Sequence, residues 1–544
     1  MNDFDRPGFF RAVRFEPCAD QLMPGSSGRP MRRAIWLLLP LLFTLSACKS
    51  PAERAADLAA QADAQAAAGN LVAARKAISE AISLRDDIPA YQQLLGAIAM
   101  KAGDVGGAYR AFSRALDVDP TNMTALAYVA NLGIQLGQIG RAEEAADRLL
   151  TLDPNALPGL QAKGMIAIAR DKNAEAARIG DRMLALRPGD ETGTIIKARA
   201  LAKQGQFDEA LQLIDATTPR AGQSAALLTN KLNIYRNLRQ PEAMEGLLDQ
   251  LARDSDAPAS VRLDQVNLFY RLGKVDAARE AAMALLRDGR ADPADYRALQ
   301  RLWWEFDKTP VPATSIAAVA GWQDPVAVQQ TVRYLIARDD IATADAIRRA
   351  APASAQPLLA SLAARLLAAG GRDADARKAA DALLKKDEQD VDALLVRAVT
   401  ALDQGKLAVA VEAAQLARAN DPANAETYLV LARIAQADNA DWRVRNAYEE
   451  GLKNLPQNFL LLEHYTQFLH QSGDKGRAVS VARAFARATP ASVHAWTILA
   501  AQCRWANDDG CLQAALAGQK NAETTYLVDD PPGTMRNRGL FGRI

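Results

Sequence analysis

The stretch from Thr121 to Pro154 reads TNMTALAYVANLGIQLGQIGRAEEAADRLLTLDP, and its pattern decides the fold. Gly137 lies between two segments that are rich in alanine and leucine. Glycine accepts the left-handed backbone conformation with which a chain leaves one helix and enters the next. The stretch therefore predicts two helices joined by a tight turn at Gly137, with Asp153-Pro154 ending the second helix and starting a new unit.

The turn residue recurs along the chain with a period of 34. The series comprises Gly69, Gly103, Gly137, Asp171, Gly205, Arg239, Gly273 and Asp307, and it resumes at Gly371, Gly405, Asn439, Gly473 and Asn507. One irregular unit near Asp339 and Asp340 separates the two runs. Most of these residue types cap or reverse a helix, so the series predicts repeated helix pairs.

Small residues and prolines keep the same register as the turns. Five residues after the turn the chain has Ala74, Ala108, Ala142, Ala176, Ala210, Ala278, Ala376, Ala410 and Ala478. Seven residues before it lie Ala62, Gly96, Ala130, Gly164, Ala198, Ala364, Ala398 and Ala432. Seventeen residues after it lie Pro120, Pro154, Pro188, Pro422, Pro456 and Pro490. Small side chains at fixed offsets allow two helices to approach closely, and the prolines begin new units.

A 34-residue period with these offsets resembles the tetratricopeptide repeat. The resemblance covers about residues 52–522. It implies an all-α fold, a right-handed superhelical solenoid of about fourteen helix pairs in which each pair buries one face on its neighbours. Other helical solenoids have different periods.

The repeat pattern is interrupted once, near residues 307–324. Thr309-Pro310-Val311-Pro312 stands where the second helix of a unit should begin, and two prolines prevent an immediate helix. The sequence therefore predicts an N-terminal array over 52–306, an irregular connector over 307–324 that is either a rigid corner or a hinge, and a C-terminal array over 325–522. The tail, 523–544, has no helical period and is predicted to be disordered.

Trp303, Trp304 and Trp322 cluster around this interruption. Two interpretations are open. The three rings could seal the exposed ends of both arrays, or they could form an aromatic contact surface for a partner or a glycan.

The N-terminal segment 31–47 resembles a bacterial lipoprotein signal peptide. Arg32 and Arg33 precede an apolar stretch that is too short to span a bilayer, and the stretch ends in the lipobox Leu45, Ser46, Ala47 and Cys48. The resemblance implies cleavage before Cys48 and lipid attachment to its thiol. An ordinary secretory signal that happens to contain a cysteine is the alternative.

Two further expectations concern this end of the chain. Residues 1–30 have no regular pattern, and we expect Met31 to be the true start and 1–30 to be a misannotated upstream extension. Lys49 follows the lipobox, and by the known sorting rule this favours the outer membrane of a Gram-negative bacterium, with the protein lipid-anchored on the periplasmic face.

Composition argues against nucleic acid as a partner. Removal of residues 1–47 takes six basic and four acidic residues from totals of 65 and 64, which leaves a net charge near −1. Catalysis is not expected either. There are three histidines, and His464 and His470 are six residues apart, whereas two metal ligands on one helical face would be four apart. We expect no cofactor, no metal and no enzymatic activity.

The two cysteines beyond the lipobox lie on either side of one turn. Cys503 and Cys511 are placed symmetrically about Asn507, so they should face each other on antiparallel helices. An oxidising periplasm would allow a disulfide that staples the terminal repeat. Two unlinked buried thiols are the alternative.

The resemblance also points to a binding surface, because in this family the first helix of each pair lines a concave groove. The position six residues before the turn usually points inward, and here it holds Asn131, Arg199, Asn233 and Asn267, with Lys203, Arg236, Tyr270 and Arg271 nearby. Amides can bond an extended peptide backbone, and arginines bind carboxylates bidentately. An inner surface that is merely wet, with its arginines paired to local acids, is the alternative.

The sequence therefore predicts a non-catalytic protein-interaction scaffold held in the cell envelope by its N-terminal lipid. Its expected partners are envelope proteins of an exopolysaccharide export, pilus, secretion or outer-membrane assembly machine, and the length of the array leans towards polysaccharide export. Direct binding of a glycan or peptidoglycan is the alternative.

Overall fold

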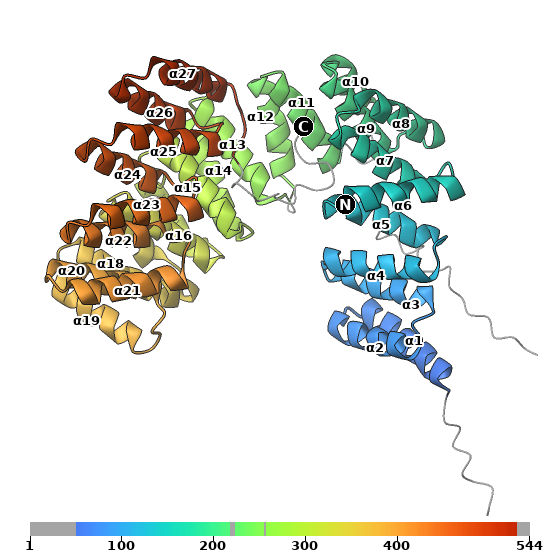
Figure 1. Ribbon diagram of the computed structural model, residues 1–544, viewed down its shortest axis with the longest axis horizontal. Helices are drawn as coiled ribbons and strands as arrows, with labels where there is room; N and C mark the ends of the chain where they lie inside the picture. Colours follow the sequence, from blue (N-terminus) through green and yellow to red (C-terminus); the bar gives the residue numbers. More distant parts are fainter. Residues whose placement is uncertain (1–49, 218–223, 255–256, 530–544) are drawn as a thin grey trace, which may run out of the picture. The chain divides into compact units, whose positions relative to one another are not determined.

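The computed structural model describes residues 50–217, 224–254 and 257–529. These residues form α-helices and two short 3-10 helices, and they contain no strand (Figure 1). The prediction of an all-α solenoid of repeated helix pairs is confirmed.

The first seven pairs follow one another directly along the chain. Their first helices are α1 (Pro51–Ala67), α3 (Pro89–Lys101), α5 (Met123–Gln135), α7 (Leu157–Ala169), α9 (Glu191–Lys203), α11 (Ala225–Asn237) and α13 (Ala259–Arg271). Their second helices are α2 (Leu71–Leu84), α4 (Val105–Val118), α6 (Ile139–Leu152), α8 (Asn173–Leu186), α10 (Phe207–Ala216), α12 (Pro241–Ala252) and α14 (Val275–Asp288).

An incomplete unit follows, made of α15 (Pro293–Phe306) and the 3-10 helix η2 (Ala313–Gly321). The remaining first helices are α16 (Pro325–Ala337), α18 (Gln356–Ala369), α20 (Val391–Asp403), α22 (Ala425–Ala437), α24 (Phe459–Gln471) and α26 (Val493–Ala506). Their second helices are α17 (Ile341–Ala350), α19 (Asp373–Leu384), α21 (Leu407–Asn420), α23 (Asp441–Asn454), α25 (Lys475–Ala488) and α27 (Asp509–Glu523), and a 3-10 turn, η3 (Ala353–Ala355), precedes α18.

The chain divides into two compact units after Tyr91. The first contains α1 and α2. Its first helix begins with a capping box, in which the Ser50 hydroxyl accepts from the Glu53 amide at 3.2 Å and the Glu53 carboxylate accepts from the Ser50 amide at 2.6 Å. Ala62 and Ala74 are fully buried where the two helices meet. The second unit contains the rest of the chain, and all the following features belong to it.

The turn positions adopt the predicted left-handed conformation with one exception. Gly137 has φ 71°, and the non-glycine residues Asp171, Arg239 and Asn439 have φ between 52° and 55°. Asp307 was predicted to belong to this series, and this prediction is wrong, because its φ is −140°. Its buried carboxylate instead accepts hydrogen bonds from side chains of the preceding unit, so the residue anchors a corner and does not reverse a helix.

The small residues lie where two helices are in closest contact. A Cβ atom on Gly96 would come within 2.7 Å of the Phe112 ring, and one on Gly164 within 2.9 Å of Ile196. Ala142 and Ala410, five residues after their turns, are fully buried. The repeat register in the sequence therefore reflects steric limits on helix packing.

The connector packs as a corner. Val311, Val319 and Trp322 are buried in the same hydrophobic cluster as Trp303, and this cluster contains residues from before and after the interruption. Trp303 is 1 % exposed and Trp322 is 2 % exposed. These two rings therefore seal the core, and the hypothesis that they form an aromatic contact surface is wrong for both of them.

A ladder of polar pairs links successive units. In each pair, an acidic residue on the second helix of one unit faces a donor, sixteen residues later, on the first helix of the next. The pairs are Asp147–Lys163 at 2.9 Å, Asp181–Lys197 at 2.6 Å, Asp215–Lys231 at 2.6 Å, Asp249–Gln265 at 2.7 Å, Asp381–Arg397 at 2.8 Å and Glu449–Tyr465 at 2.8 Å. Partly exposed pairs of this kind contribute about 0.2–1 kcal/mol each.

Candidate functional site

The inner residues of α11 and α13 form a pair of matching polar centres. Asn233 and Asn267 both lie six residues before a turn. The Asn233 carbonyl accepts from Arg236 at 2.5 Å, and the Asn267 carbonyl accepts from Arg271 at 3.0 Å. Each arginine thereby fixes the orientation of an amide. The two Nδ2 atoms are buried, and neither has a hydrogen-bond partner among the described residues.

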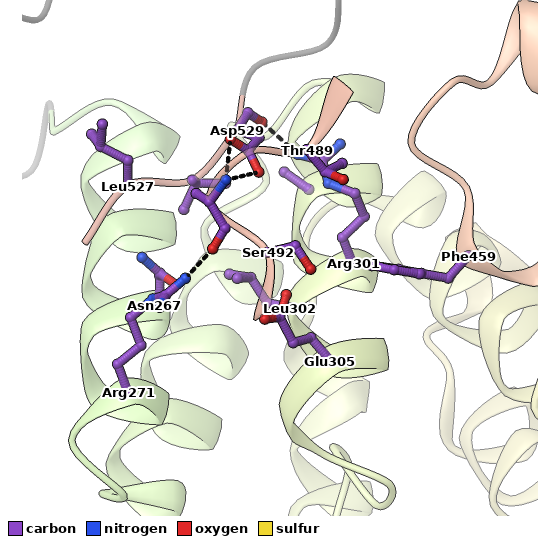
Figure 2. Close-up of a pocket in the computed structure, with 13 residues that line it drawn as sticks. Asn267, Arg271, Arg301, Leu302, Glu305, Phe459, Thr489, Ser492, Leu527 and Asp529 are labelled. Atoms are coloured by element: carbon purple, nitrogen blue, oxygen red, sulfur yellow. Dashed lines mark hydrogen bonds between the residues drawn. The ribbon is translucent and has the colours of Figure 1, made fainter. Parts of the chain in front are cut away.

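The chain's own C-terminal segment lies across these centres. After α27 ends at Glu523, residues Thr524–Asp529, here called the strap, continue without regular secondary structure. The strap contacts α11 through Arg236 and lies beside the α13 and α15 residues that Figure 2 labels. Arg236 Nε donates to the Tyr526 carbonyl at 2.8 Å, and Arg301 donates to the Asp529 carbonyl at 2.6 Å. The strap is therefore held through its backbone, as an extended peptide ligand would be.

Two strap side chains pack against apolar surroundings, and one of them is fully buried. Val528 is 5 % exposed and belongs to the cluster that contains Leu302 and Trp303. Tyr526 is partly buried and packs against the apolar cluster of α11, α12 and α13. Burial of two such side chains contributes a few kcal/mol, which makes the strap a tightly packed element of this face.

The carboxylate of Asp529 ends the strap. Both of its oxygens accept from the Ala491 amide, at 3.2 Å, just before α26 (Figure 2). Burial raises the pKa of Asp529 to about 6, because the nearby Arg301 and Arg271 and the Ala491 amide only partly offset the loss of hydration.

Helices α24 and α26 cover the remainder of this face. Glu305 on α15 accepts from the Val493 amide at 2.8 Å, so it caps the N-terminus of α26 from a distant part of the chain. Glu463 on α24 accepts from Trp304 at 2.8 Å and from His494 at 3.0 Å. Burial alone would raise the pKa of Glu463, but the hydrogen bonds from His494 and Trp304 outweigh it and lower the pKa.

The equivalent face of α5 and α9 is different. Asn131 and Arg199 are partly exposed, and Lys203 is exposed, with its Nζ 3.4 Å from the Asp171 carboxylate. The Arg199 Nε is buried without a hydrogen-bond partner among the described residues. Burial lowers the pKa of Arg199 to about 10, so the side chain remains charged at neutral pH. This face presents a partly desolvated cation.

Comparison with known proteins identifies the repeats. Two family models described as tetratricopeptide repeat match the chain, one at residues 99–164 and 167–231 and the other at 361–425. The chain is a tetratricopeptide repeat protein.

Solved structures resemble parts of this tetratricopeptide repeat protein. A tetratricopeptide repeat protein from Parabacteroides merdae is 17 % identical over 45 % of this chain and 98 % of its own, with a TM-score of 0.40. PilF of Pseudomonas aeruginosa is 17 % identical over 38 % of this chain and 93 % of its own, with a TM-score of 0.31. The MamA protein is 15 % identical over 33 % of this chain and 92 % of its own, with a TM-score of 0.29. No curated protein matches the chain.

Tetratricopeptide repeats indicate a protein-interaction scaffold, and such proteins are in general non-catalytic. Within the described ranges, no three His, Cys, Asp or Glu side chains are grouped so that they could hold a metal ion. None of the described helices combines the length and apolar character that crossing a membrane requires.

The structure separates the predicted groove residues into two sets. Asn131, Arg199 and Lys203 lie on a face that is at least partly accessible. Asn233, Arg236, Asn267 and Tyr270 are buried, and Arg271 donates to the carbonyls of Ala522 and Ala491 at 2.8 Å and 2.6 Å. The prediction of an open partner groove is wrong for this second set, because the chain's own later residues fill it.

Tyr270 differs most from its predicted role. Its hydroxyl donates to the Asp307 carboxylate at 3.0 Å, and the same carboxylate accepts from Arg279 at 2.8 Å. Burial and the neighbouring Asp307 raise the pKa of Tyr270. The residue therefore supports the corner after α15 and does not contribute to an open groove.

Predictions at the two ends of the chain have separate outcomes. Leu45, Ser46, Ala47 and Cys48 lie outside the described residues. Cys503 on α26 and Cys511 on α27 form a disulfide, with their Cα atoms 5.6 Å apart. The tail was predicted to be disordered from residue 523, and this is wrong for the strap, because Tyr526 and Val528 are packed against apolar side chains.

Sequence reasoning missed the strap and two α15 residues, Arg301, which binds the strap, and Glu305, which caps α26. One signal was present in the sequence. Tyr526-Leu527-Val528 is a short apolar run that directly follows the last repeat, and such a run is a candidate for docking onto a core.

Proposed function

We propose that this tetratricopeptide repeat protein is a lipid-anchored scaffold of the bacterial cell envelope that captures a segment of a partner protein on the inner face of α5 to α9. The observation that carries the proposal is Arg199. Its guanidinium is charged and partly desolvated, and its Nε has no hydrogen-bond partner among the described residues. A carboxylate on a partner would satisfy that donor with a charge-assisted bond.

The surrounding residues support binding of a peptide more than of a bulk polyanion. Lys163 and Lys197 are already paired with Asp147 and Asp181 at 2.9 Å and 2.6 Å, which leaves a local positive site and not a continuous basic surface. Asn131 lies at the same repeat position, and its amide is held by the Ala127 carbonyl at 2.9 Å. A single acidic side chain in an extended segment fits this distribution of charge.

The location in the envelope is proposed from the sequence. The lipobox Leu45 to Cys48 and the following Lys49 support lipid attachment at Cys48 and retention at the outer membrane. We propose that the partner belongs to an exopolysaccharide export, pilus, secretion or outer-membrane assembly machine.

Crosslinking in cells, followed by purification of the lipidated protein from membranes, tests the scaffold. We expect components of one export or assembly machine to be recovered. They should be lost with Arg199→Glu and retained with Lys385→Glu, a lysine on the other array. Recovery of polysaccharide or peptidoglycan fragments without a stable protein partner would refute the scaffold.

The anchor needs its own test. Cys48→Ser should abolish metabolic labelling with a radioactive fatty acid and leave the protein poorly processed. Efficient acylation of the Cys48→Ser protein would refute attachment at this residue.

A further inference from the structure

The strap makes the contacts that a bound peptide would make. Arg236 and Arg301 hold its backbone carbonyls, Val528 is buried in the apolar cluster that contains Trp303, and Tyr526 packs, partly buried, against the cluster of α11 to α13. The residues of the strap lie 290 and 228 positions away from those two arginines, so the contact is between distant parts of one chain. Its geometry is that of a ligand on a receptor.

The fit of the strap is incomplete. The buried amides of Asn233 and Asn267 each keep one Nδ2 donor without a partner among the described residues. A cavity of about 210 Å³ lies beside Thr524–Leu527 and is lined by Asn233, Arg236, Asn237 and Arg239. An unsatisfied buried donor costs about 1–3 kcal/mol, so this face has binding capacity that the strap does not use.

We propose that the strap is a displaceable occupant of the face formed by α11, α13 and α15, and that it occupies the site of an extended partner segment of the same chemical character. That segment would carry an aromatic residue, two aliphatic residues and an acidic residue, as Tyr526-Leu527-Val528-Asp529 does. A partner with an additional carbonyl or side-chain acceptor satisfies the donor of Asn233, which lines the cavity, and fills that cavity. The proposal rests on the scaffold function, and it does not depend on the lipid anchor.

The covalent connection of the strap to α27 gives the strap a kinetic and thermodynamic advantage over any free peptide. A segment joined to its site by a short connection has an effective concentration of about a millimolar or more. A partner must therefore bind more tightly than the strap, or the strap must be released first. In either case the protein is closed at this face until a partner of matching chemistry competes.

A fluorescent peptide with the sequence of residues 524–529, acetylated and amidated at its ends, is the probe. Its binding is measured by fluorescence anisotropy with the full chain and with the strap variant Tyr526→Ala/Val528→Ala. We expect the strap variant to bind the peptide at least tenfold more tightly than the unaltered chain. A peptide in which the valine is replaced by aspartate should bind neither protein, and this control leaves the protein itself unchanged.

Arginine substitutions in the strap variant locate the site. Arg236→Gln should weaken peptide binding at least tenfold. The matched control Arg418→Gln removes an arginine that pairs with Glu450 at 2.8 Å outside this face, and it should leave peptide binding unchanged. Circular dichroism at 222 nm verifies that each variant keeps its helices.

Three results would overturn the proposal. Equal peptide affinity in the unaltered chain and the strap variant would show that the strap does not occupy the binding site. Absence of peptide binding by a fully helical strap variant would make the strap an ordinary part of the core. Loss of a concentration-dependent dimer in the strap variant would identify the occupant as the strap of a second copy. Failure of the crosslinking experiment on Arg199 would leave all three readouts unaffected, so the two proposals fail separately.

Discussion

The inner faces of α5 to α9 and of α11 to α15 carry similar residues in the same register, and only the first of them is free of a covering segment of the described chain. Arg199 and Asn233 both lie six residues before a turn. Arg199 is partly exposed with an unbonded Nε, whereas Asn233 is buried beneath the strap. Position in the repeat decides where a side chain points, and a distant part of the chain decides whether it remains accessible.

The covered face depends on a few long-range contacts, each of which can be removed. Asp307 holds its corner, Glu305 caps α26, and Asp529 ends the strap. The open face depends on exposed pairs that contribute little. Substitutions should therefore have large effects on the covered face and small effects on the open one.

The largest effect should come from Asp307. Asp307→Asn removes the charge that pairs with Arg279 and accepts from Tyr270, and we expect about 3 kcal/mol lower free energy of unfolding. Chemical denaturation measures it. Burial opposes ionisation, but the hydrogen bonds of Arg279 lower the pKa of Asp307 below its usual value. Its contribution is therefore present above about pH 4 and is lost as the pH falls through the lowered pKa.

A change below 0.5 kcal/mol for Asp307→Asn would contradict this assignment. The pH dependence gives a second check, because the stability difference between the two proteins should disappear in acid.

Glu305→Gln should have an intermediate effect. The substitution weakens the bond to the Val493 amide and removes a negative charge at the N-terminus of α26, for an expected loss of about 1 kcal/mol. Amide hydrogen exchange should accelerate in the first turn of α26. The matched control is Glu143→Gln on α6, because the Glu143 carboxylate pairs with Arg170 at 2.7 Å, far along the chain from α26. This control substitution should leave amide exchange in α26 unchanged.

The strap should respond to pH through Asp529. Docking raises the pKa of this carboxyl to about 6 from an ordinary value near 4. The docked strap thus binds a proton more tightly than the released strap, so docking is strongest below pH 4 and weakens as the pH rises through about 6. We expect the docking equilibrium to fall about tenfold between pH 5 and pH 7.

Amide hydrogen exchange in α11, which carries Arg236, measures this change by mass spectrometry. The exchange rates are first corrected for the intrinsic effect of pH on amide exchange. Asp529→Asn should remove the pH dependence. A strap that remains equally protected at both pH values would contradict the prediction.

The smallest effect should come from one pair in the ladder. Lys197→Gln removes the ion pair with Asp181, in which both side chains are partly exposed, and we expect a loss of about 0.5 kcal/mol or less. The difference should shrink further in 1 M salt. A decrease of more than 2 kcal/mol in the free energy of unfolding would show that the open face of α5 to α9 depends on single contacts as strongly as the covered face does.

Much of the fold could be predicted, because the information is local. Gly137 and Asn439 mark their turns by their conformational preferences, and Gly96 and Gly164 mark close helix contacts by their lack of a Cβ atom. Asp307 could not be predicted this way. Aspartate is compatible with a turn, and only the positions of Tyr270 and Arg279 in space give it another role.

The candidate site was half predictable for the same reason. Helical register correctly placed Asn233 and Asn267 beside Arg236 and Arg271, and hydrogen bonds now join them. Nothing near Arg236 in the sequence indicates that Tyr526 will return to it across 290 positions. The strap is specified by tertiary contacts that local pattern cannot reveal.

The ladder bears on how such a chain can change length. In the Asp181–Lys197 and Asp215–Lys231 pairs, the acid is on the second helix and the donor is on the next first helix, sixteen residues later. Asp147 and Lys197 are 50 residues apart, so loss of a 34-residue unit between them would leave a spacing of sixteen residues. Lys197 would then become the new partner of Asp147. An insertion or deletion of another length between an acid and its partner would change the sixteen-residue spacing, so gain or loss of a complete 34-residue unit is the change in length that leaves the ladder intact.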